Sequence, residues 1–183
     1  MFKCRGRVLE RSMKDRIILD LCGGTGSWSR PYAEAGYDVR VITLPDQDVR
    51  NYSPPEDVHG VFAAPPCTEF AVSGARWWKS KPKEKLEEAL QIVHACLDII
   101  NRVNPRWWAL ENPAGRLKKF IGLPAYVFHP YEFGNPWTKK TFLWGKFRLP
   151  MKLNQKHPLA NWCGRGNQTN GRPHGLALCD AVT

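Results

Sequence analysis

Residues 16–26 have the sequence RIILDLCGGTG, in which a short apolar run leads directly into a glycine-rich turn. The apolar run predicts a strand buried on both faces, as in a parallel sheet. Ser27 and Ser29 then predict the capped start of a helix, which we expect to end at Gly36. Residues 38–42, DVRVI, predict a second strand. This order of strand, glycine loop, helix and strand predicts the nucleotide-binding half of a doubly wound α/β fold.

The chain beyond this unit continues the alternation of strands and helices. Residues 58–63 predict a third strand, and residues 82–102 predict a long amphipathic helix whose apolar positions recur at helical spacing. Residues 107–110 predict a further buried strand, and residues 126–128 and 141–144 predict strands of a β-rich remainder. The fold class we expect is therefore α/β, with a doubly wound, mostly parallel sheet.

Length and composition favour a single domain covering residues 1–183. The 183 residues are 43% hydrophobic, which is enough to form a core, and no linker or repeat divides them. No apolar run approaches the about 18 residues of a membrane helix, so no membrane partner is expected. The basic N-terminus lacks an apolar stretch, which argues against a secretory signal. Six cysteines without CxxC pairs favour a reducing cytoplasm.

The net charge of +10 is concentrated in one part of the chain. Residues 112–183 contain 11 basic and two acidic residues, whereas the first 111 residues are nearly balanced. A basic segment next to a balanced one is typical of a surface that contacts phosphates. We therefore expect a nucleic-acid partner, bound mainly by this basic C-terminal part.

Two segments beyond the glycine loop carry reactive groups. Pro65 and Pro66 present Cys67 at the carboxyl end of the predicted third strand, where open α/β sheets bind ligands. A cysteine there is a nucleophile if its pKa is lowered, and otherwise a small buried side chain. Glu111 ends the strand of residues 107–110, where desolvation would raise the pKa of its carboxyl group and keep a proton available. A thiol and an acid beside a cofactor loop predict an active site.

These segments resemble the DNA cytosine-C5 methyltransferases. The matching segments occur in the family's order: Asp20 to Gly26, Asp48-Val49-Arg50, Pro65-Pro66-Cys67, Glu111-Asn112-Pro113 and residues 134–140, GNPWTKK. Residues 67–74, CTEFAVSG, resemble the family's PC-x-x-F-S-x-x-G loop, and residues 172–177 resemble closing segments of small phage-type members. The resemblance spans about residues 16–180 and implies the Rossmann-like fold of methyltransferases that use S-adenosylmethionine (SAM).

The resemblance also implies the chemistry. Cys67 would attack C6 of a flipped-out cytosine, Glu111 would donate a proton at N3, and Asn112 would support the pocket. SAM is the implied cofactor, and its implied binding residues are Asp20, Cys22, Gly24, Gly26, Asp48 and Pro66. DNA, duplex or single-stranded, is the implied partner, and the candidate contacts are Ser73, Trp77, Lys79, Lys139 and Lys140. Trp77 and Trp78 together are also consistent with a hydrophobic lid.

The chain departs from the family at several points. After the second strand, the acidic residue expected for the ribose hydroxyls is absent, so Asp46 replaces it or the contact is lost. Lys139 and Lys140 stand where the family has an arginine-rich motif, and lysine lacks arginine's planar fork. Only about 26 residues separate Gly145 from Arg172, so we expect a minimal recognition region at 146–171. Weak specificity, a short target context or a targeting partner protein would follow.

Other functions remain open on the sequence alone. Methylation of cytosine in RNA is the first alternative, and a catalytically inert, methylase-like DNA-binding subunit is the second, although Cys67 and Glu111 argue against the latter. Methylation at cytosine N4 or adenine N6 is disfavoured, because those sites use a Pro-Pro-aromatic turn. No metal is expected, because the four candidate ligands lack zinc-knuckle spacing: they are His157, Cys163, His174 and Cys179. The oligomeric state and the target context stay undetermined.

Overall fold

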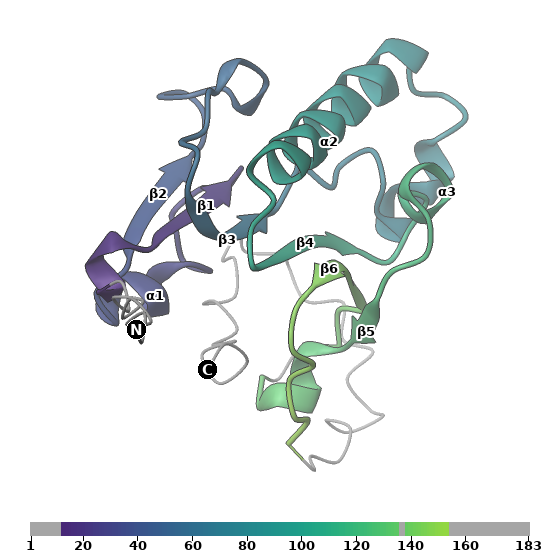
Figure 1. The fold of residues 1–183 in the computed structure, drawn as a ribbon. Helices are drawn as coiled ribbons and strands as arrows, with labels where there is room; N and C mark the ends of the chain where they lie inside the picture. The colour runs from purple at the N-terminus through teal and green to yellow at the C-terminus, as the bar shows by residue number, and fades with distance from the viewer. Residues whose placement is uncertain (1–11, 136–137, 154–183) are drawn as a thin grey trace, which may run out of the picture.

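The computed structural model describes residues 12–135 and 138–153, which form one sheet with helices on its two faces (Figure 1). Within these residues the six strands are ordered β2-β1-β3-β4-β6-β5. Their bounds are β1 Ile17–Leu21, β2 Asp38–Ile42, β3 Val58–Ala63, β4 Trp107–Pro113, β5 Tyr126–Phe128 and β6 Thr141–Lys146. Strands β1 to β4 are parallel, whereas β6 is antiparallel to both β4 and β5. The predicted strands and the mostly parallel α/β sheet are confirmed.

The helices differ greatly in length. The described helices are α1 Arg30–Glu34, α2 Lys83–Val103 and α3 Lys118–Ile121, with short 3-10 helices η1 Met13–Asp15, η2 Val49–Asn51, η3 Val72–Trp77 and η4 Pro130–Phe133. Figure 1 shows α2 along one side of the sheet and α1 on the other. None of the described helices is both long and apolar enough to cross a membrane.

Successive side chains of each strand point to opposite faces of the sheet, so the core consists of two clusters, one on each face. On β1, Leu19 and Leu21 belong to the cluster that contains the buried face of α2. Ile18, one position along, belongs to the second cluster, where aromatic rings from α1, β3 and β4 pack together. Gly60 makes room for this aromatic cluster, because a Cβ there would lie 2.2 Å from the indole of Trp107. Both faces of the sheet are therefore covered, as a buried parallel strand requires.

The buried stripe of α2 is rotated slightly from the predicted one. Val93 and Ile100 are buried as expected, and Cys96 between them is fully buried. The leucines at 86, 90 and 97 lie partly buried at the border of the stripe. Helical spacing identified the correct face, and its centre is formed by Ala89, Val93, Cys96, Ile99, Ile100 and Val103.

The helix after the glycine loop begins later than predicted, and serine does not cap it. Residues 24–29 form turns, and α1 starts only at Arg30. Ser29 makes no capping hydrogen bond. Its hydroxyl donates instead to Asp20 Oδ2 at 2.6 Å and to the carbonyl of Gly26 at 3.3 Å. The serine hydroxyl therefore serves as a donor to the buried carboxyl group of Asp20 instead of accepting from a backbone N–H of the helix.

Several predicted features lie outside the described residues. These include the larger part of the predicted recognition region, residues 154–171, and the closing segment 172–177. The four residues considered as zinc ligands also lie there. The single-domain prediction for residues 1–183 and the boundary of the basic part at residue 112 stay predictions.

Candidate active site

The carboxyl ends of the parallel strands form one aligned row. In the sheet register, Leu21 lies beside Ile42 and Ala63, and Ala63 lies beside Leu110. The four segments that follow these residues therefore leave the sheet along the same edge. They are the glycine loop, the segment containing Asp48, the Pro-Pro-Cys turn and the end of β4. The fold thus gathers the segments that the sequence analysis singled out, which are separated by up to about 90 positions in the chain.

The glycine loop is bent by residues in the left-handed region. Cys22, Gly24 and Gly26 have φ values of 58°, 59° and 68°, which glycine adopts without strain and cysteine does not. Cys22 N donates to the carbonyl of Ile42 at 2.8 Å, so the loop begins as an extension of the sheet. The two glycines therefore provide a tight turn whose backbone lies at the carboxyl edge.

The side chain of Asp20 packs against the glycine loop at Gly23. Its side chain is fully buried, and a Cβ at Gly23 would lie 2.4 Å from its carboxyl carbon. Burial raises the pKa of Asp20 to about 6, although the hydrogen bonds from Ser29 act in the opposite direction. Oδ1 has no hydrogen-bond partner among the described residues. Asp20 thus shapes the loop, and its direct contact with a cofactor stays a prediction.

Cys22 lies close to two acidic side chains and a second thiol. Its Sγ is 4.0 Å from that of Cys96 on α2. This hydrogen bond lowers the pKa of Cys22, whereas burial and the negative charges of Asp48 and Asp20 raise it. The charges of Asp20 and Asp48 therefore act on Cys22 at the glycine loop, and contact of these three residues with a cofactor stays a prediction.

Asp48 is held in place by Arg50. Its carboxylate accepts hydrogen bonds from Arg50 N at 2.9 Å and from Arg50 Nε at 3.0 Å, and these bonds lower the pKa of Asp48. The side chain of Asp48 is 19% exposed. Arg50 Nε also contacts Oδ2 at 3.0 Å and Nη2 contacts the same oxygen, so Arg50 engages both carboxylate oxygens, and a contact of Asp48 with a cofactor stays a prediction.

These residues fit a SAM-type cofactor. The sharp turn at Gly24 lets a ligand approach the backbone closely. The Asp48 carboxylate stays ionised, and Asp20 has a buried oxygen without a partner among the described residues. Pro66, the sixth predicted cofactor contact, is exposed at the same edge. Asp46, the candidate for the ribose contact, is exposed, and that role stays a prediction.

Cys67 begins a tight turn directly beyond β3. The strand ends at Ala63, and Ala64 N still donates to the carbonyl of Leu21 at 2.9 Å. The carbonyl of Cys67 accepts from the backbone N–H groups of Phe70 and Ala71, both at 2.9 Å. Cys67 is half-buried. A partly accessible thiol on a fixed backbone can serve as a nucleophile.

Asn112 connects the end of β4 to the Pro-Pro-Cys turn. Its fully buried side chain donates from Nδ2 to the carbonyl of Pro65 at 3.1 Å. The sequence predicted that the strand ends at Leu110, but β4 continues to Pro113 because β6 pairs with it there. Pairing with β3, in contrast, ends at Leu110. Half-buried Glu111 therefore lies one position past the parallel pairing, on a strand tied to the Cys67 turn.

The predicted DNA contacts lie on two segments that border this site. Ser73, Trp77 and Lys79 are exposed in or just after η3, and Trp77 is 58% exposed. Lys139 and Lys140 are exposed where the carbonyl of Lys140 accepts from Ala114 N at 2.9 Å, immediately past the end of β4. Both segments are exposed, and their contact with nucleic acid stays a prediction.

The two tryptophans of the pair differ in exposure. Trp77 is exposed, whereas Trp78 is partly buried, with the guanidinium of Arg116 4.7 Å from the centre of its ring. The guanidinium of Arg76 lies 5.7 Å from the centre of the Trp77 ring, and stacking of Trp77 on a base stays a prediction, whereas Trp78 packs against the protein. Sequence reasoning missed Arg116, because nothing in a single sequence indicates its partner.

No metal centre is found in the described part of the chain. Residues 12–135 and 138–153 contain no group of three or more His, Cys, Asp or Glu side chains that could hold a metal ion.

Comparison with known proteins supports the fold. No protein-family model and no curated protein matches the chain. Among 58 matching chains of solved structures is a crystal structure described as a candidate DNA modification methyltransferase encoded within an E. coli prophage. The two proteins are 17% identical with a TM-score of 0.51, over 72% of this chain and 47% of that one. The present chain thus spans about half the length of that structure. The match and the sheet topology together show that this chain has a Rossmann-like methyltransferase fold.

Proposed function

We propose that this protein is a SAM-dependent DNA methyltransferase that acts on C5 of cytosine through a covalent bond to Cys67. The observation that carries the proposal is the hydrogen bond from Asn112 to Pro65, which joins the Cys67 turn to the strand bearing Glu111. The glycine loop opens on the same edge of the sheet. The methyltransferase fold supports the reaction class, and the described function of the prophage protein supports DNA as the substrate.

Cys67 and Glu111 would act on different atoms of the target cytosine. The thiolate of Cys67 forms a bond to C6 while the carboxyl group of Glu111 gives a proton to N3, which makes C5 nucleophilic. SAM, when bound, supplies an electrophilic methyl group for C5. A water molecule acting as base then removes the C5 proton, which re-forms the C5–C6 double bond and expels the Cys67 thiolate, while the N3 proton returns to Glu111. The target base must leave the stack for this geometry, which costs a few kcal/mol in duplex DNA.

The basic surface would supply affinity for DNA without much sequence information. Exposed lysines and an arginine lie along the described part of the basic segment: Lys118, Lys119, Lys139, Lys140, Lys146 and Arg148. Contacts to phosphates position a protein but do not specify sequence. With a minimal recognition region at 146–171, the enzyme would methylate many cytosines unless a partner protein supplies targeting.

The substrate is tested by supplying methyl-labelled SAM with separate pools of duplex DNA, single-stranded DNA and RNA. We expect label in 5-methylcytosine from DNA. Label mainly in RNA would favour the alternative of RNA methylation. Label in N4-methylcytosine or N6-methyladenine would contradict the proposed role of Cys67, and absence of label in every pool would favour the inert DNA-binding alternative.

The nucleophile is tested by covalent trapping. DNA containing 5-fluorocytosine should form a stable adduct whose peptide contains Cys67, because fluorine at C5 blocks the final elimination. Cys67→Ala should abolish both the adduct and methyl transfer. Cys4→Ala, which removes a thiol with no assigned role, is the matched control. Normal methyl transfer by Cys67→Ala would refute the covalent mechanism.

A further inference from the structure

The loop after Cys67 is joined to the segment after β4 by backbone contacts. Val72 N donates to the carbonyl of Ala114 at 3.0 Å, and Arg116 N donates to the carbonyl of Phe70 at 2.9 Å. Between these bonds, Ala71 and Gly115 form an isolated antiparallel bridge. A Cβ at Gly115 would lie only 1.8 Å from the Phe70 oxygen, so only glycine allows this approach. The segments that follow Cys67 and Glu111 are therefore in direct contact.

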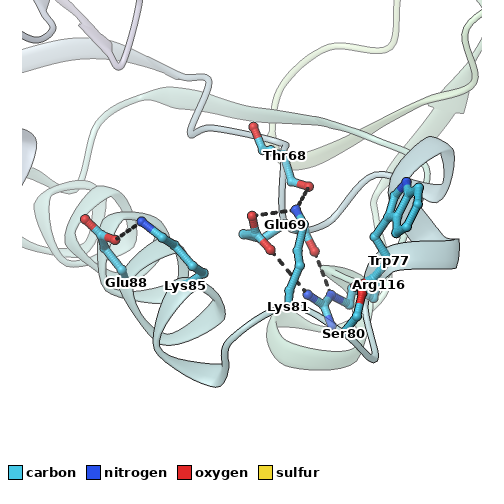
Figure 2. Close-up of polar contacts among 8 residues, drawn as sticks. All are labelled: Thr68, Glu69, Trp77, Ser80, Lys81, Lys85, Glu88 and Arg116. Carbon is cyan, nitrogen blue, oxygen red and sulfur yellow. Dashed lines mark hydrogen bonds and ion pairs between the residues drawn. The ribbon is translucent and has the colours of Figure 1, made fainter.

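Side chains reinforce this contact around one carboxylate. Glu69, two residues after Cys67, is 9% exposed. Its Oε1 accepts from Lys81 Nζ at 2.7 Å, and its Oε2 lies 3.8 Å from Nη2 of Arg116 (Figure 2). Both cations also contact backbone: Arg116 Nε donates to the Glu69 carbonyl at 2.6 Å, and Lys81 Nζ donates to the Thr68 carbonyl at 3.2 Å. We name Glu69, Lys81 and Arg116 the Glu69 cluster.

The Glu69 cluster also holds the last residue of the loop, Lys81, against its first residues, Thr68 and Glu69. The carbonyl of Trp77 accepts from the backbone N–H and the hydroxyl of Ser80 and from Lys81 N, each at 3.1 Å. This turn directs Lys81 back to Glu69, while Arg116 covers Trp78. These contacts hold the first and last residues of segment 68–81 together, and Trp77 within this segment remains exposed.

We propose that the Glu69 cluster positions Cys67 relative to Glu111 and holds Trp77 at the entrance to the site. This inference rests on the proposed function. Glu69, Lys81 and Arg116 are positioning residues rather than catalytic ones, because their contacts are with backbone, with the Trp78 ring and with one another. A displacement of about 1 Å at a reacting group can cost about 100-fold in rate, so a loosened loop should reduce turnover. Cofactor binding should be affected much less, because the predicted SAM contacts come chiefly from the loops after β1 and β2.

The test compares Glu69→Gln with Glu88→Gln. Glu88 pairs with Lys85 on α2 at 3.9 Å, but both side chains are more than half exposed (Figure 2). The control therefore removes a carboxylate from a surface ion pair with little effect on folding. We expect Glu69→Gln to lower kcat on DNA at least 10-fold while KM for SAM changes less than threefold. Glu88→Gln should leave both constants unchanged.

Two further measurements do not depend on methyl transfer. The alkylation rate of Cys67 by iodoacetamide, followed by mass spectrometry of its peptide, should change at least threefold in Glu69→Gln. Trypsin should cleave faster after Arg76 and Lys79 in the loosened loop, and the bond after Lys81 is protected by Pro82. If Glu69→Gln fails to fold, Lys81→Met serves instead, since Lys81 is 26% exposed; Lys81→Arg should restore most of the lost turnover.

The outcomes separate the two proposals. Unchanged kcat, or a rise of KM for SAM in proportion to the loss of activity, would overturn the positioning role. Unchanged Cys67 alkylation together with unchanged cleavage at Arg76 would overturn it as well. If the wild-type protein makes no 5-methylcytosine, the proposed function fails, and alkylation and cleavage still decide whether the Glu69 cluster holds the loop.

Discussion

Replacing Asp20 with asparagine should change how the stability of the protein depends on pH. Burial raises the pKa of Asp20 from its ordinary value of 3.8 to about 6. Each pKa unit corresponds to about 1.4 kcal/mol, so ionised Asp20 costs the folded state about 3 kcal/mol at neutral pH. The folded protein holds this proton more tightly than the unfolded chain does. Stability from this group is therefore fully present below pH 3.8 and is lost as the pH rises through 6.

Asp20→Asn removes the ionisation but keeps an oxygen that can accept from Ser29. The amide also introduces N–H groups where Oδ1 has no partner, which costs about 1–3 kcal/mol at every pH. This cost is constant, so the informative quantity is the difference between variant and wild type at two pH values. Linkage predicts that the free energy of unfolding of Asp20→Asn rises by about 2 kcal/mol relative to wild type between pH 4.5 and pH 7.5.

Urea denaturation at a series of pH values measures this difference directly. Glu88→Gln, an exposed carboxylate on α2, is the control and should show no such trend. A difference between Asp20→Asn and wild type that stays constant from pH 4.5 to pH 7.5 would refute the reasoning. It would mean that Asp20 is not a desolvated acid beneath the glycine loop.

Four further outcomes are expected. Glu111→Gln should lower the chemical rate at least about 100-fold, as for a lost general acid, while SAM affinity measured by calorimetry is unchanged; an equal loss of affinity would indicate a cofactor role. Lys139→Ala combined with Lys140→Ala should weaken binding to unrelated DNA sequences equally. The slope of log binding constant against log salt concentration should become shallower by about two. A loss of affinity that depends on the DNA sequence would contradict a phosphate role. Bisulfite sequencing of a treated plasmid should show methylation sorted by at most one or two neighbouring bases, whereas confinement to a site of four or more bases would refute the argument from the short recognition region. Gly60→Ala, which directs a Cβ to 2.2 Å from an indole ring, should reduce the free energy of unfolding by about 1–3 kcal/mol, whereas Gly74→Ala, with its nearest atom at 3.7 Å, should be neutral.

Local sequence patterns were sufficient for the strands and for the reactive residues. The apolar run of β1 and the helical spacing along α2 follow from burial alone, since each pattern corresponds to one kind of buried surface. Cys67 and Glu111 were identified because each follows such a run, at the end of a strand where ligands bind in open α/β sheets. The roles of these residues stay predictions, but their common edge of the sheet is confirmed by the register.

Partners far apart in the chain were decided only by the tertiary structure. Ser29 was expected to cap a helix and instead donates to Asp20, because burial of that carboxylate creates a stronger need for a donor. Glu69 resembled any polar loop residue, yet it lies between Lys81 and Arg116, which are 12 and 47 positions away. A sequence records periodicity and local conformation, since these depend on neighbours along the chain. It does not record which buried charge meets which cation, because that depends on the strand order and register that bring distant loops together.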